Sequence, residues 1–338
     1  MSAASRQPNL NTEHAAGADS LRPGPAARGR VLLEALVGSW VYLCGLTSIV
    51  LVLLIFLFVF REAFPLLREY SLVAFLSGRE WRPTDDPAAF GLVPLLLSSL
   101  LVTIGAIAIS VPLGISSAIF IGEIAPRRLR EILKIIVELL ASVPSVVLGF
   151  FGLTILGPIL QNVLKMDTGT NMLAGSITLA FMAIPTIATI SEDALAGVSR
   201  ETREGSLGLG ATRWQTIRHV SVPAAASGIV AATMLGIGRA IGETMVVLMV
   251  TGNGVGQNLS ALMNGPQNPL ATFRNTFGAY GELCRTLTAT IAAEMGEVAP
   301  GDAHYHALFL LGVVLFLLTF LINFAADLAL RRSQKGSR

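Results

Sequence analysis

The chain has 338 residues, of which 53% are hydrophobic and 14% are charged, and its mean hydropathy is +0.67. Soluble proteins carry about 25% charged residues, so this composition excludes an ordinary soluble domain and indicates a protein of the lipid bilayer. The net charge of +2 gives no sign of nucleic-acid binding. The two cysteines, Cys44 and Cys284, are far apart in the sequence and are expected to stay unpaired.

Six hydrophobic segments are long enough to cross the ~30 Å hydrocarbon core of a membrane as helices. Residues 1–34 precede them, and their Ser, Ala, Pro, Gly and Arg content without apolar periodicity predicts a disordered cytoplasmic tail. The first segment is too long for the hydrophobic region of a signal peptide and is predicted to be retained. The predicted spans are 35–60, 91–120, 132–164, 172–190, 223–250 and 307–326.

The third segment is too long for one straight span, because 132–164 would extend about 50 Å as a helix. Pro144 is its expected break, since a proline inside a helix removes a hydrogen bond and clashes with the preceding turn. Lys and Arg residues set the orientation. With the N-terminus in the cytoplasm, 16 of them lie on the cytoplasmic side and 7 on the other, which places both termini inside.

This topology divides the chain into a series of regions. An extracytoplasmic loop at 61–90 follows the first span, and a core of the remaining spans occupies 91–330. That core contains a cytoplasmic loop at 191–222 and an extracytoplasmic loop at 251–306, and the cytoplasmic C-terminus is 331–338. The predicted fold class is therefore an all-α polytopic membrane protein with six transmembrane helices.

The loop at 191–222 ends in the sequence REGSLGLGATRWQTIRHVSVP, residues 203–223. It predicts two short helices with a turn at Gly210, because glycine adopts left-handed backbone angles without steric cost. Pro223 then begins the next span, where a proline in the first turn is tolerated. A compact helix–turn–helix between two spans is suited to docking a cytoplasmic partner.

This segment resembles the EAA loop of ABC importer permeases, since Glu204, Gly210 and Pro223 have the spacing of that pattern. Gly205 and Ser206 stand where the family has two alanines, and Gly205 is expected to weaken the helix by about 1 kcal/mol relative to alanine. The resemblance implies an ABC type I importer permease fold. It also implies that the loop docks in a groove of a separate ATPase subunit. The predicted coupling residues are Glu204, Gly210, Ala211 and Thr212.

The chain itself is not predicted to hydrolyse ATP. Its lysines are Lys134, Lys165 and Lys335, and none follows a glycine as the phosphate-binding Walker A loop requires. No cofactor is expected in this chain, and ATP and Mg²⁺ are expected on the partner ATPase.

The fifth segment carries two charges, Arg239 and Glu243, inside a predicted span. A charge at the centre of a membrane costs roughly 2.5–3.5 kcal/mol, so the pair needs a reason. At a separation of four residues the two side chains share one helix face and are expected to neutralise each other, while Gly238 and Gly242 allow close packing on a neighbouring helix. Two alternatives follow: a purely structural ion pair, or a gate whose guanidinium meets a passing anion.

The sequence GRAIGETM at 238–245, continued by Gly252 and Asn253, is similar to a segment of PstC-type phosphate permeases. Further similarity lies in FGLVP at 90–94, ELLASVPSVV at 138–147 and ISEDAL at 190–195. The resemblance implies a permease subunit of an ATP-driven importer of inorganic phosphate. Its implied partners are a PstA-type permease subunit, an ABC ATPase dimer, an extracytoplasmic phosphate-binding protein and membrane lipid, in the cell's inner membrane.

Other charged residues leave alternatives. Glu138 is either a second charge near the transport path or a side chain that reaches the cytoplasmic surface. Glu192 and Asp193 are expected at the membrane interface or in the coupling loop. His304 and His306 resemble a metal motif only weakly, because no carboxylate or cysteine is evidently arranged around them, and an interfacial loop is favoured. Competing functions are permeases for sulfate, molybdate or phosphonate, a secondary transporter, which would need inverted repeats, and a scaffold.

Overall fold

The computed structural model describes residues 25–264 and 268–336, and the chain divides into two units. The first unit ends at Phe58 and consists of most of helix α2, Pro25–Ala63. Residues 1–24 of the predicted tail lie outside the described part. The expectation of disorder was wrong for 25–34, where α2 already runs. Pro25 suits the first turn of a helix, and the alanines, arginines and leucines that follow favour the helical state.

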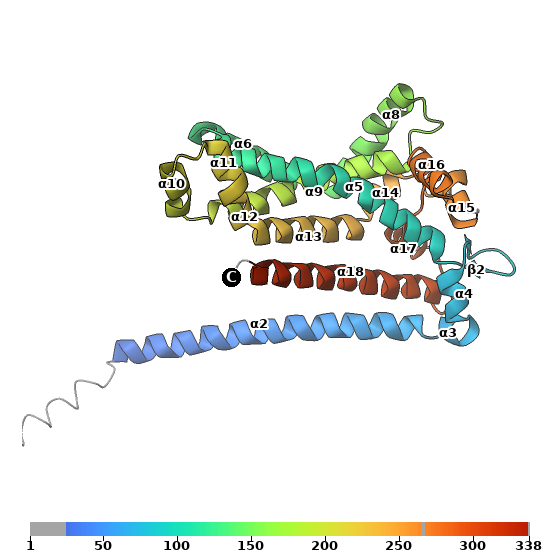
Figure 1. The fold of residues 1–338 in the computed structure, drawn as a ribbon. Coiled ribbons are helices and arrows are strands. Elements are labelled where there is room, and N and C mark those ends of the chain that lie inside the picture. Colours follow the sequence, from blue (N-terminus) through green and yellow to red (C-terminus); the bar gives the residue numbers. More distant parts are fainter. Residues whose placement is uncertain (1–24, 265–267, 337–338) are drawn as a thin grey trace, which may run out of the picture. The chain divides into compact units, whose positions relative to one another are not determined.

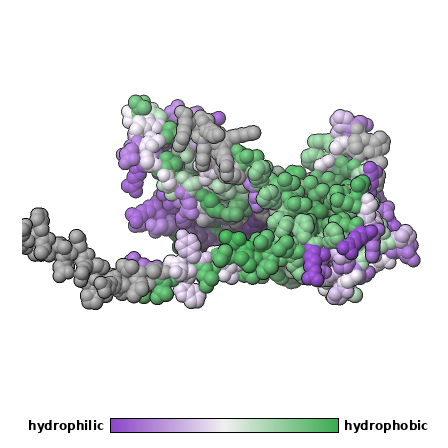
Figure 2. Space-filling view, turned by 90° about the horizontal axis from the view of Figure 1, so that it is seen from below, coloured by the Kyte–Doolittle hydropathy of each residue, from purple (hydrophilic) through white to green (hydrophobic). Residues whose placement is uncertain are grey.

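Five helices in the described part of the chain are long and apolar enough to cross a membrane, at 36–69, 93–124, 145–164, 172–196 and 303–325. A sixth crossing is formed if the helices at 213–224 and 226–242, bent by 69°, count as one span. Figure 2 shows that hydrophobic residues gather over the middle of the face it draws, with hydrophilic residues at the two ends. This distribution is that of a membrane protein.

The second unit is almost entirely helical (Figure 1). Its long helices are α5 (Val93–Ile119), α9 (Met172–Ala196), α13 (Ala226–Gly242) and α18 (Ala303–Gly336). The shorter ones are α3 (Leu66–Glu69), α4 (Leu72–Ser77), α14 (Met245–Val250), α15 (Gln257–Asn264), α16 (Pro269–Ala279) and α17 (Leu287–Glu294). A small antiparallel hairpin of β1 (Trp81–Arg82) and β2 (Ala89–Phe90), which was not predicted, lies in the loop before α5.

The segment predicted as one long third span is broken as expected. The helix α6 (Arg127–Ala141) ends just before Pro144, and α7 (Ser145–Phe151) begins after it. A π-helical stretch η2 (Gly152–Leu156) and α8 (Gly157–Leu164) continue the second piece. By length and composition only 145–164 qualifies as a span, and α6 is a separate, more charged helix before it.

The helices α5, α9 and α13 pack closely around Ile187 of α9. A Cβ atom added to Gly114 of α5 would lie 2.8 Å from the Ile187 side chain, and one added to Gly236 of α13 would lie 2.6 Å from it. Small residues at these points let the helix backbones approach, as is common between helices in membranes. Of the two glycines predicted to pack on a neighbouring helix, Gly238 faces α18, where an added Cβ would lie 3.8 Å from Asn323 Oδ1, whereas a Cβ on Gly242 would have no neighbour within 4 Å.

A hydrophobic cluster joins the loops that were predicted to be extracytoplasmic to the ends of the long helices. Phe75, Trp81, Phe90, Leu287 and Leu308 are among its buried members, and they come from α4, the hairpin, α17 and α18. The loop predicted at 251–306 is therefore a packed structure of α15, α16 and α17. The cluster fixes the geometry of the polar network described below.

Candidate functional site

The helix that carries Arg239 ends at Gly242, three residues after it. Glu243 has extended backbone angles, φ −70° and ψ 133°, so the helix is interrupted between α13 and α14. The Glu243 carboxylate accepts hydrogen bonds from the backbone N–H groups of Met245 and Val246, at 3.1 and 3.3 Å. It therefore caps the start of α14. The expected neutralisation of Arg239 by Glu243 was wrong, because the four-residue spacing works only in a continuous helix.

Arg239 lies on a largely uncovered face of α13, next to Thr186 of α9. The buried face holds Ile229, Ala232, Gly236 and Ala240, whereas Arg239 is exposed and its guanidinium Nη1 donates to Thr186 Oγ1 at 3.3 Å. An arginine within a membrane span does not face lipid without a large cost. This face is therefore suited to a partner subunit or a water-filled path.

A small polar cavity adjoins Glu243. Its volume is about 10 Å³, which is near the minimum that one water molecule needs. Hydroxyl groups line it, and Thr288 Oγ1 donates to the Glu243 backbone carbonyl at 2.8 Å, which helps to fix the helix break. The lining side chains with polar groups are Ser99, Thr103, Glu243, Thr286 and Thr288.

The other charges singled out in the sequence lie on α6 and α9. Glu138 is exposed on α6, which ends before the span that begins at Ser145. Glu192 is 6% exposed and accepts from Lys134 Nζ of α6 at 2.7 Å, and Asp193 accepts from the same atom at 3.2 Å. The hydrogen bond to Glu192 raises the pKa of Lys134. The contacts of Lys134 with Glu192 and Asp193 join α6 to α9.

The predicted coupling loop forms two helices, α10 (Arg200–Gly208) and α11 (Arg213–Thr216), around a turn at Gly210. Gly210 has φ +91°, which confirms the predicted turn. The backbone N–H of Gly210 donates to Leu207 and that of Ala211 to Ser206, the pattern of a Schellman C-cap. Thr212 then caps α11 in a reciprocal capping box with Gln215.

The coupling loop presents an open surface. Glu204 is exposed, Leu209 is 92% exposed and Trp214 is 59% exposed. Cβ atoms added to Gly205 and Gly208 of α10 would meet nothing within 4 Å. Nothing inside the described chain requires glycine at these two helical positions, although glycine costs about 1 kcal/mol relative to alanine there. An exposed apolar turn next to a helix face that lacks side chains is typical of a surface to which another protein docks.

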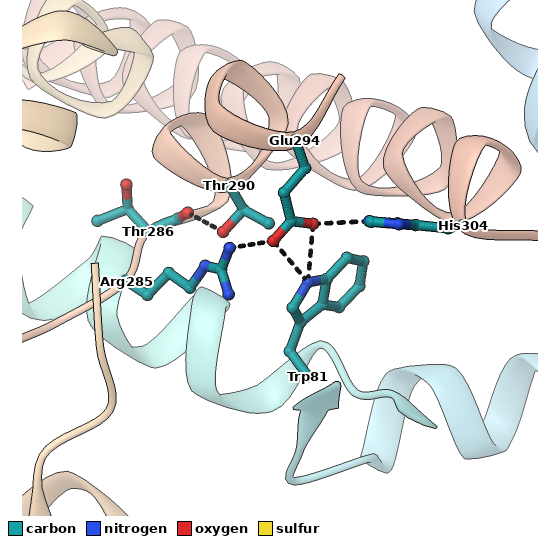
Figure 3. A network of polar contacts seen from close by, with 6 residues as sticks. All are labelled: Trp81, Arg285, Thr286, Thr290, Glu294 and His304. Atoms are coloured by element: carbon teal, nitrogen blue, oxygen red, sulfur yellow. Dashed lines mark hydrogen bonds and ion pairs between the residues drawn. The ribbon is translucent and has the colours of Figure 1, made fainter. Parts of the chain in front are cut away.

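A second polar site lies among the loops predicted to be extracytoplasmic (Figure 3). Its centre is Glu294, whose carboxylate accepts from Trp81 Nε1 at 3.1 Å, from His304 Nε2 at 2.8 Å and from the Arg285 guanidinium. The four side chains line a cavity of about 560 Å³. Sequence analysis missed this network, because its members come from three separate segments and no local pattern joins them.

Replacing Glu294 with Gln is expected to destabilise the extracytoplasmic loops. The amide keeps the size of the side chain but leaves the mostly buried Arg285 without its charged partner, which we expect to lower the free energy of unfolding by about 1–3 kcal/mol. Thermal unfolding of the purified protein in detergent measures this change. Glu297→Gln is the control, since Glu297 lines the same cavity but is exposed. Equal melting temperatures for both variants would contradict the structural role.

The two histidines singled out in the sequence, His304 and His306, each contact an oxygen atom of the protein. His304 contacts Glu294, and His306 Nδ1 lies 2.6 Å from the Glu62 carbonyl oxygen. In the described part of the chain no group of three or more metal-ligating side chains comes together. The cysteines are both free, and burial raises the pKa of the Cys284 thiol to about 12.

Comparisons with known proteins identify the family of the chain. Residues 110–336 match the family described as "Binding-protein-dependent transport system inner membrane component". The "Probable ABC transporter permease protein YqgH" of Bacillus subtilis is 41% identical over 76% of this chain and 77% of its own length. The "Phosphate transport system permease protein PstC 2" of Mycobacterium tuberculosis is 32% identical over 89% of this chain and 92% of its own length. PstC of Mesorhizobium japonicum is 34% identical over 77% of this chain and 78% of its own length.

The fold also has counterparts among solved structures. A chain in the crystal structure of a bacterial alginate ABC transporter, in complex with an alginate pentasaccharide-bound periplasmic protein, superposes with a TM-score of 0.59. The two chains are 15% identical, and the match covers 89% of this chain and 97% of that chain. At this identity the likeness concerns the fold alone.

Proposed function

Since the chain belongs to the family of binding-protein-dependent transport system inner membrane components, we propose that it is the membrane-spanning permease subunit of an ATP-driven importer of inorganic phosphate. The observation that supports phosphate as the substrate is the sequence identity of 32–34% with permeases of phosphate transport systems over most of the chain. The fold is the predicted all-α fold of ABC importer permeases, and the chain is a multi-pass inner membrane protein.

Arg239 supports an anionic substrate in this proposal. Its guanidinium lies on the uncovered face of α13 and makes a single side-chain hydrogen bond, to Thr186, so most of its donors are free to meet oxygen atoms. A guanidinium matches two phosphate oxygens at once. Glu243, which caps α14, would keep negative charge near the path and weaken anion binding enough for release. Glu138, which is exposed on α6, remains in the proposal as a second charge near the path.

The coupling loop supports a separate ATPase as the energy source. In the proposal Leu209 and Trp214 contact a groove of the ATPase, and the glycine face of α10 allows its surface to approach closely. ATP and Mg²⁺ bind to that partner and not to this chain. The further partners are a PstA-type permease subunit against the uncovered face of α13 and an extracytoplasmic phosphate-binding protein.

Competition between oxyanions tests the substrate. Proteoliposomes that contain the complete transporter, with ATP inside, are expected to accumulate radiolabelled phosphate when its binding protein is added outside. Unlabelled phosphate should abolish the signal, whereas sulfate, molybdate and phosphonates at the same concentration should leave it unchanged. Inhibition by one of these other anions, stronger than by phosphate, would assign the runner-up substrate instead.

Both termini are expected in the cytoplasm, because Lys and Arg are in excess on that side of the predicted topology. A phosphatase or fluorescent protein fused after Arg338 reports the side of the membrane directly. We expect fluorescence and no phosphatase activity. A second fusion within the loop after Val250 should give the opposite pair of signals, and phosphatase activity at the C-terminus would overturn the six-span topology.

A further inference from the structure

An ion pair lies beneath the coupling loop, where it meets the membrane-spanning helices. Arg203 of α10 has its guanidinium Nη2 2.9 Å from Glu123 Oε1, and the same nitrogen donates to the Leu195 carbonyl oxygen at 2.5 Å. The side chain of Arg203 is 24% exposed and that of Glu123 is 10% exposed. Glu123 belongs to the π-helical end of α5, η1 (Phe120–Ile124), and Leu195 to the last turn of α9. One guanidinium therefore ties the coupling loop to two spans.

The ends of those two spans are fixed by further contacts with α6. Arg130 donates to the carbonyl oxygen of Gly122, directly beside Glu123. Lys134 binds Glu192 and Asp193 of α9. The cytoplasmic ends of α5 and α9 therefore form one braced body. A force applied at Glu123 would act on this body and not on a single helix end.

Hydrophobic packing does not hold α10 to the spans. None of its residues is buried, and the hydroxyl of Ser206 pairs with that of Thr216 inside the coupling loop itself. Arg203 is the charged contact between α10 and the braced body in the described part of the chain. Its Nε is buried without a hydrogen-bond partner, and its Nη2 meets Glu123 Oε1 as an ion pair without hydrogen-bond geometry, so a small rotation of α10 would let the pair form the two-bond fork that arginine and carboxylate favour.

We propose that the Arg203–Glu123 ion pair transmits movement of the coupling loop to α5 and α9. This inference rests on the proposed docking of an ATPase to the loop. Arg203 and Glu123 act as positioning residues: they touch neither nucleotide nor transported anion, and they convert a rotation of α10 into a displacement of the cytoplasmic ends of the two spans.

The test compares phosphate transported per ATP hydrolysed in the complete reconstituted transporter. The variants are Arg203→Glu, Glu123→Arg and the double charge swap, and Arg128→Gln is the control because Arg128 is an exposed arginine at the same end of the molecule. We expect each single variant to transport roughly tenfold less phosphate per ATP, as for a coupling between contacting residues. The swap should restore most of the ratio, and the control should match the wild type.

Each result decides the proposal. If the pair were merely structural, the single variants would lower the amount of assembled transporter but leave its ratio of phosphate to ATP unchanged, which would overturn the inference. Should the charge-reversed variants fail to assemble, Arg203→Gln and Glu123→Gln, which keep the size of the side chains, take their place: an unchanged ratio of phosphate to ATP in both would overturn the inference. Absence of ATP-driven uptake by the wild-type transporter would instead sink the proposed function itself.

Discussion

Replacing Arg239 with Ala is expected to lower phosphate uptake about 10- to 150-fold, because hydrogen bonds from a charged group contribute about 1.5–3 kcal/mol. The structure favours this result over a collapse of the fold. Arg239 is exposed on α13, and its side chain is bonded to Thr186 and not to Glu243. Removing it therefore leaves no buried carboxylate without a partner. Uptake is measured in membranes that contain matched amounts of the subunit.

Two further variants separate charge from geometry at this position. Arg239→Lys keeps the positive charge but loses the planar fork, so we expect slow uptake between that of the wild type and that of Arg239→Ala. Thr186→Val removes the hydrogen bond that orients Arg239 and should have a smaller effect than either. Wild-type uptake by Arg239→Ala at equal subunit levels would remove this residue from the transport path.

Replacing Gly210 with Val is expected to abolish coupling to the ATPase. Gly210 has φ +91°, and a β-branched residue in that conformation is strongly disfavoured, so the turn would rearrange and displace α11 from α10. The added side chain itself would meet nothing within 4 Å, so the effect arises from the backbone alone. We expect normal insertion into the membrane, loss of ATPase co-purification and loss of ATP-driven uptake.

Gly301 provides a matched control for this change. It has φ +90°, a Cβ added there would also meet nothing within 4 Å, and it lies in the loop before α18. Gly301→Val therefore imposes the same backbone strain at a place remote from the coupling loop. It should retain ATPase binding and uptake. Equal loss in both variants would indicate general destabilisation and would count against docking through the Gly210 turn.

Features that depend on neighbouring residues could be predicted from the sequence. The break at Pro144 and the turn at Gly210 follow from the backbone restrictions of proline and glycine, and both are present. The hydrophobic spans also follow from composition and length. The start of α2 at Pro25 was missed because a segment of mixed composition carries no apolar period, although its residues favour a helix.

Features that depend on tertiary contacts could not be predicted in this way. The helix break at Glu243 is fixed by Thr288, which is remote in sequence, so continuous helical spacing gave a wrong partner for Arg239. The network around Glu294 joins Trp81 and His304 from segments that share no pattern. The ion pair of Arg203 with Glu123 was missed for the same reason, since the two residues lie in separate segments.

The measurement that tests the central claim most directly is phosphate accumulation in proteoliposomes that contain the complete transporter, with no ion gradient across the membrane. An ATP-driven permease predicts accumulation with ATP inside and binding protein outside, and none with a nonhydrolysable ATP analogue or without the binding protein. Accumulation by this chain without ATP, driven by an imposed proton or sodium gradient, would contradict the account and identify a secondary transporter.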